Sequence, residues 1–169
     1  MADSLSTTVL SGIISAVVSY FVSVFLKERE YKNDYFKKVI DKRLTTYQYV
    51  ENVIAEFKYN KTRGDDRLFH IVFSDPPTFT NFYEQSVRVA IKNKIWLSAD
   101  TATYLNALND ILLSSLTEHN IVRTSESLTE GGRKNYELIN MVIEKLENSL
   151  RHDLYHLKLE IELNSLLLK

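Results

Sequence analysis

The chain has 169 residues, enough for one compact domain and an additional segment. Its 21 lysines and arginines balance 22 aspartates and glutamates, so no overall positive charge favours binding to DNA. The absence of cysteine excludes disulfide bonds, cysteine-bound metals and thiol catalysis, and four glycines and two prolines are too few for the turns of an all-β fold.

An uncharged stretch of 22 residues runs from Leu5 to Leu26. As a helix it would cover about 33 Å, slightly more than the hydrocarbon core of a bilayer. The alternative is a cleaved signal peptide, but basic residues before the apolar run and small residues at its end are missing. We therefore expect residues 1–26 to form a retained transmembrane anchor.

Small and hydroxyl side chains recur every three or four residues within this stretch and would share one helix face. Lipid provides no hydrophobic drive between helices, so membrane helices associate through close backbone contact and interhelical hydrogen bonds. We expect this face to bind another copy of the chain; a water-lined pore and serines bonded to their own helix are the alternatives. This serine face consists of Thr8, Ser11, Gly12, Ser15, Ala16, Ser19 and Ser23.

A basic segment follows the uncharged stretch, with seven basic and four acidic residues from Lys27 to Arg43. The positive-inside rule then predicts a single-pass protein of the inner membrane, with its N-terminus outside and residues 27–169 in the cytoplasm. We expect Lys27, Arg29 and Lys32 to contact anionic lipid headgroups.

Apolar residues at three- and four-residue spacing predict a stalk helix from Lys27 to about Asn60 that joins a helical domain. Residues 67–73 have a β-like composition, but a strand needs a partner. We expect an irregular hydrophobic loop there, with a strand completed by a second subunit as the alternative.

Two helix starts are predicted in the middle of the chain. Asp75 followed by Pro76 is typical of a capping residue and the first helical position, with Asn81 as an alternative cap. Ser98 is expected to cap the next helix, which would run to about Asn120.

The polar segment RTSESLTEGGR then breaks the helical pattern, and Gly131 and Gly132 are expected to be its flexible point. A last helix is predicted from Lys134 to Leu168. The expected fold class is all-α, an up-down helical bundle on a membrane helix. The expected organisation is an anchor over residues 1–26, a juxtamembrane stalk over 27–60 and a cytoplasmic helical domain over 61–169.

A weak anion site is predicted where basic side chains share a helix face. Arg88 and Lys92 lie four residues apart with Lys94 nearby, and Arg123 adds a further donor. A small anionic ligand or a nucleotide would suit such a cluster. No glycine-rich phosphate loop accompanies it, and a solvated charged face is the alternative.

The string RHDLYH places His152 and His156 four residues apart, with Asp153 where the zinc-protease motif H-E-x-x-H has its glutamate. Aspartate is one methylene shorter than glutamate, and no third metal ligand is evident. We therefore expect surface histidines, no catalytic residue, no bound metal and no cofactor. A metal-dependent hydrolase using His152 and His156 is the alternative.

The serine-rich span, the segment KEREYKNDYFKKVIDKRL and the short helical domain with IWLS resemble, in their layout, small bacterial single-span membrane proteins. Some proteins of this layout are effectors in phage defence, including ones gated by cyclic oligonucleotides. Together with the serine face, this layout predicts a homo-oligomeric membrane protein whose cytoplasmic domain senses a ligand or partner and acts at the membrane, as a pore or in phage defence. A passive membrane tether or adaptor is the alternative.

Overall fold

The structure is a computed structural model that describes residues 2–62, 67–117 and 124–167, with the side chains of residues 2–18, 116, 117 and 165–167 outside the description. It divides into two units, residues 1–41 and residues 42–169. The second unit therefore includes the end of the predicted stalk.

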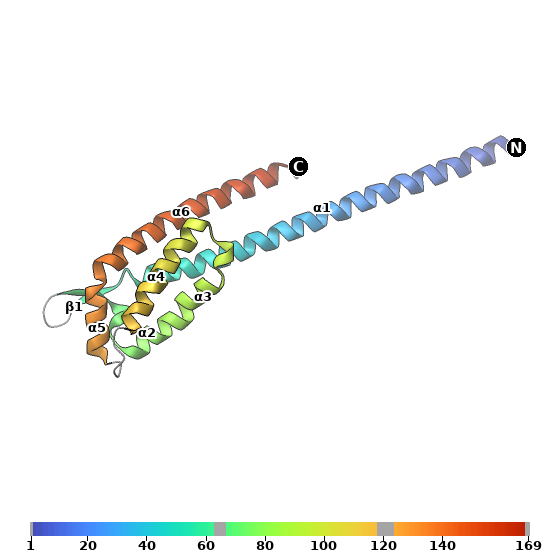
Figure 1. The fold of residues 1–169 in the computed structure, drawn as a ribbon. Coiled ribbons are helices and arrows are strands. Elements are labelled where there is room, and N and C mark those ends of the chain that lie inside the picture. The colour runs from blue at the N-terminus through green and yellow to red at the C-terminus, as the bar shows by residue number, and fades with distance from the viewer. Residues whose placement is uncertain (1, 63–66, 118–123, 168–169) are drawn as a thin grey trace. The chain divides into compact units, whose positions relative to one another are not determined.

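Most of the described chain is helical, as expected for the all-α class (Figure 1). The α-helices are α1 (Ala2–Glu56), α2 (Pro76–Phe82), α3 (Arg88–Lys92), α4 (Ala99–Thr117), α5 (Ser125–Lys134) and α6 (Tyr136–Leu167). A π-helical turn over Tyr83–Val87 joins α2 to α3, and single 3-10 turns occupy Ile71–Phe73 and Lys94–Trp96.

In the first unit, the large apolar side chains between Tyr20 and Leu26 are exposed. Within the part of the chain whose side chains are described, no helix combines the length and apolarity that a membrane crossing needs. The remainder of the predicted anchor, residues 1–18, lies outside that part.

The second unit is organised around the pairing of α4 with α6, which pack along one another (Figure 1). Their leucines and isoleucines recur at helical spacing, so each helix presents one apolar stripe that must be buried. The end of α1 completes the core. The core side chains of these three helices include Tyr47, Val50, Val53, Ile54, Leu105, Leu108, Leu112, Ile139, Leu146 and Leu157.

The expectation of a loop over residues 67–73 is wrong for part of that segment. Strand β2 (Leu68–His70) pairs with β1 (Asn60–Thr62) in an antiparallel hairpin, with Asn60 opposite His70. Because α1 ends at Glu56, before the predicted end of the stalk, residues 60–62 are available as the partner strand. The second subunit that the alternative required is not needed.

The expected polar break also proves to be a helix, α5, in which Thr124 caps the start by accepting a hydrogen bond from the N–H of Ser127. Gly132 lies inside it and is buried. A Cβ atom at Gly132 would lie 2.7 Å from Cγ of Phe73, closer than real side chains approach. This glycine therefore permits close packing of α5 against Phe73, rather than flexibility.

Both predicted caps are confirmed. The Asp75 carboxylate accepts a hydrogen bond from the N–H of Thr78 at 2.9 Å, and this bond lowers the pKa of that carboxyl. Ser98 Oγ accepts from the N–H of Thr101 at 3.2 Å at the start of α4. The alternative cap, Asn81, lies within α2.

Candidate functional site

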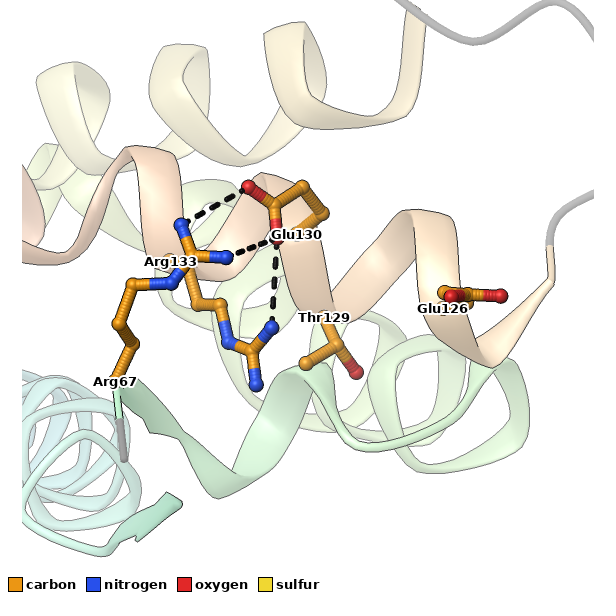
Figure 2. Close-up of a pocket in the computed structure, with 5 residues that line it drawn as sticks. All are labelled: Arg67, Glu126, Thr129, Glu130 and Arg133. Atoms are coloured by element: carbon orange, nitrogen blue, oxygen red, sulfur yellow. Dashed lines mark hydrogen bonds and ion pairs between the residues drawn. The ribbon is translucent and has the colours of Figure 1, made fainter. Parts of the chain in front are cut away.

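A hollow of about 450 Å³ opens beside α5 and the start of β2. Figure 2 shows its lining: Arg67 reaches up from the hairpin side, and the other side chains come from α5. Glu126, Glu130 and Arg133 share one face of this helix because they are spaced by four and three residues. The lining residues are Arg67, Glu126, Thr129, Glu130 and Arg133.

Glu130 stands between two guanidinium groups in this hollow (Figure 2). The two terminal nitrogens of Arg67 each lie 3.4 Å from a carboxylate oxygen of Glu130. Nη1 of Arg133 lies 3.5 Å from Oε2 of Glu130. Charge-assisted hydrogen bonds normally measure about 2.7–2.9 Å, so all three contacts are loose.

Arg133 is the more enclosed of the two arginines, with 13% of its side chain exposed. Its guanidinium carbon lies 5.7 Å from the centre of the Phe69 ring, within the range of a cation–π interaction. Thr129 is buried, and its hydroxyl bonds to the carbonyls of Phe73 and Ser125. Both guanidinium groups can donate hydrogen bonds to a carboxylate or phosphate group of a ligand.

Sequence reasoning missed this hollow. Glu130 and Arg133 lie in the segment that was expected to be a polar break, and Arg67 approaches them only because the β1–β2 hairpin folds back. The helix-compatible spacing from Thr124 to Arg133 is the one signal that could have indicated the α5 half of the site.

The predicted anion cluster is distributed among different neighbours. Arg88 is ion-paired with Glu84 at 2.5 Å, which raises the pKa of the guanidinium. Lys94 donates a hydrogen bond to Asn106 at 3.0 Å. Lys92 is exposed at the end of α3, and Arg123 lies outside the described residues. Anion binding by this cluster stays a prediction.

The two histidines of RHDLYH are exposed on α6, with their Nε2 atoms 3.0 Å apart. Asp153 faces elsewhere: it is 5% exposed and accepts hydrogen bonds from the Thr101 hydroxyl at 2.8 Å and the Ser98 N–H at 3.3 Å. The aspartate in the glutamate position therefore attaches α6 to the start of α4. Among the described residues, no group of three or more histidines and carboxylates could share a metal ion.

Arg43, near the same histidines, forms an ion pair with Glu160 at 2.6 Å and a hydrogen bond with Tyr47. Burial disfavours the charge of Arg43, but these hydrogen bonds outweigh burial and raise its pKa. Burial also raises the pKa of the Tyr47 phenol. A cavity of about 360 Å³ lies here, lined by Arg43, Ser98, Ala99, Asp100, His152, Asp153 and His156.

Most of the serine face lies outside the described side chains: Thr8, Ser11, Gly12, Ser15 and Ala16. Ser19 and Ser23 are exposed. In the basic segment, Lys27 is exposed and Arg29 is partly exposed. Lys32 forms an ion pair with Glu28 at 2.7 Å, and its hydrogen bond lowers the pKa of that carboxyl.

His70, the last residue of strand β2, is fully buried in the second unit. Its Nδ1 atom lies 2.8 Å from the Phe57 carbonyl oxygen, and its ring stacks on Tyr136 at 4.8 Å between centroids. A carbonyl only accepts, so Nδ1 carries the proton. Burial lowers the pKa of His70, so the neutral ring is favoured.

Comparisons of the chain with protein-family models, with curated proteins and with solved structures found no match. Any functional proposal for this chain therefore rests on its own residues.

Proposed function

We propose that the protein is a membrane-anchored, self-associating interaction protein whose helical domain binds an anionic ligand or partner at the cytoplasmic face. The observation that carries the proposal is the exposed apolar surface at the described end of the uncharged stretch. Tyr20, Phe21 and Phe25 are 67%, 66% and 66% exposed, and Val22, Val24 and Leu26 are exposed beside them.

These residues span almost two helical turns, so their side chains cover about two thirds of the helix circumference, and Ser19 and Ser23 lie on the remaining face. A helix with so wide an apolar surface is stable when that surface is buried. A bilayer covers every side at once, and the 22 uncharged residues have the length of its hydrocarbon core. The basic residues from Lys27 onward then support the cytoplasmic placement of the helical domain.

Flotation of the full-length protein with vesicles of phosphatidylethanolamine and phosphatidylglycerol tests the anchor. We expect the wild-type protein to float with the vesicles after carbonate washing. Phe21→Glu with Phe25→Glu should remain in the dense fraction, because the uncharged stretch would then end at Tyr20 and its length of about 24 Å would be too short for the hydrocarbon core.

The matched control is Ile95→Glu, which places the same charge on an apolar side chain that is 82% exposed in the helical domain. This variant should float like the wild type. Failure of the wild-type protein to float, or equal flotation of the Phe21/Phe25 variant, would contradict the proposal.

Self-association is tested by the mass of the full-length protein in detergent. Bulky replacements on the serine face, Ser15→Leu with Ser19→Leu, should convert an oligomer into a monomer, because they prevent close helix approach. If the oligomer forms a pore, the same variant should abolish ion leakage from vesicles. Unchanged ion leakage would contradict pore formation. An unchanged oligomer would contradict the role of the serine face in self-association.

A further inference from the structure

The paired histidines of α6 bring two ring nitrogens into close contact. His152 and His156 are four residues apart on one helix face and both are exposed. Their Nε2 atoms are 3.0 Å apart, and their ring planes meet at 62°. Without a metal, this distance requires one ring to donate an N–H to the unprotonated nitrogen of the other.

A metal ion bound by both rings imposes nearly the same separation. With bonds of about 2.05 Å, two imidazole nitrogens lie about 2.9 Å apart at a right angle and about 3.4 Å apart at the tetrahedral angle. The observed distance falls inside this interval, so the separation of the two Nε2 atoms already suits a shared ion. We propose that His152 and His156 bind one divalent transition-metal ion through their Nε2 atoms.

The charges around the pair favour a cation. Asp100 and Asp153 line the adjoining cavity, and Glu160 lies one turn further along α6. The one cation that lines this cavity, Arg43, is already engaged by Glu160 at 2.6 Å. A second hollow that His152 lines is also lined by Asp100 and Lys145. Within this cluster, the carboxylates outnumber the basic groups.

The chemistry of the two ligands selects the kind of metal. Imidazole nitrogen suits zinc, nickel and copper, whereas magnesium and calcium prefer oxygen ligands. Both rings must present an unprotonated Nε2, so metal binding replaces the hydrogen bond between them and moves the proton of the donor ring to its Nδ1. Water completes the coordination, because Asp153 is committed to Thr101 and Ser98.

Isothermal titration of tag-free, full-length protein with zinc chloride tests this site. The wild-type protein should bind one ion per chain at this site. His152→Ala and His156→Ala should each weaken binding about tenfold or more, because the second imidazole then no longer acts from the same molecule. Both side chains are exposed, so circular dichroism should show an unchanged fold.

The matched control moves one ligand without changing the number of histidines. His156→Ala with Lys158→His places the two imidazoles about 120° apart around the helix, where one ion cannot reach both. This variant should bind zinc as weakly as His156→Ala. The site is overturned if the wild-type protein does not bind zinc, or if the relocated pair or either alanine variant binds it as tightly as the wild type.

Discussion

The carboxylate of Asp153 on α6 accepts a hydrogen bond from the Thr101 hydroxyl on α4, with 2.8 Å between the two oxygens. The same carboxylate oxygen lies 3.3 Å from the N–H of Ser98, where α4 begins. Both Asp153 and Thr101 are buried, and the Thr101 oxygen also lies 2.7 Å from that of Ser149. The contact joins α6 to the start of α4. It is favourable because the helix dipole stabilises a negative charge at the N-terminus of a helix.

Replacing Asp153 with alanine should therefore destabilise the helical domain. The change removes hydrogen bonds to a buried charged group and leaves the Thr101 hydroxyl with fewer partners, which costs about 2 kcal/mol of unfolding free energy. Urea denaturation followed by circular dichroism measures the loss. Asp100→Ala, an exposed carboxylate at the same end of α4, is the control and should cost less than about 1 kcal/mol. Equal losses in the two variants would show that the Asp153 contact has no special role.

The glycine pair in α5 offers a second comparison. Gly132→Ala forces a methyl group to within 2.7–2.9 Å of three atoms of Phe73, and overpacking of this kind costs about 1–3 kcal/mol. Gly131→Ala meets Ser115 Cβ at 3.9 Å, an ordinary contact, and should stabilise the helix by up to about 1 kcal/mol. Thermal unfolding of both variants should shift the midpoint in opposite directions. A shift in the same direction for both would argue against the packing role of Gly132.

The buried imidazole of His70 predicts a dependence of stability on pH. Its pKa is lowered in the folded state from an ordinary value of 6.5, so the unfolded chain binds the proton more readily. Its stabilising contribution is therefore complete above about pH 6.5 and is lost as the pH falls toward the lowered pKa, with a slope of at most about 1.4 kcal/mol per pH unit.

His70→Phe keeps the aromatic contacts with Phe57 and Tyr136 but cannot take up a proton. We expect this variant to lose the His70 contribution to the slope of unfolding free energy between about pH 5 and 7. Its stability at pH 8 should be lower than that of the wild type, since the hydrogen bond to the Phe57 carbonyl is gone. The same slope in both proteins would assign the pH dependence to other groups.

Local signals in the sequence were sufficient for several elements. The capping residues Asp75 and Ser98 act in the structure as expected, because a cap depends on atoms within three residues along the chain. The last helix that the apolar spacing predicted, from Lys134 to Leu168, corresponds to α6. The all-α class followed from the scarcity of glycine and proline together with this spacing.

Contacts between residues far apart in the sequence decided the elements and sites that the local signals did not predict. Strand β2 exists because residues 60–62 lie beside it, and α5 is a helix whose buried Gly132 fits against Phe73. The position of Asp153 in a metal-like motif carried no information about its partners, which lie 52 and 55 residues away. The charged hollow at Arg67 and Arg133 required the hairpin to bring a second arginine to α5.

The sequence by itself determined the helical periodicity, the capped helix starts at Asp75 and Ser98 and the uncharged stretch that ends at Leu26, since these depend on neighbouring residues and on composition. Only the tertiary structure decided which polar groups are buried, paired or left on the surface: Asp153 inside, His152 and His156 outside, and Glu130 between two arginines. The physical reason is that burial and pairing depend on which segments, far apart in the chain, pack together.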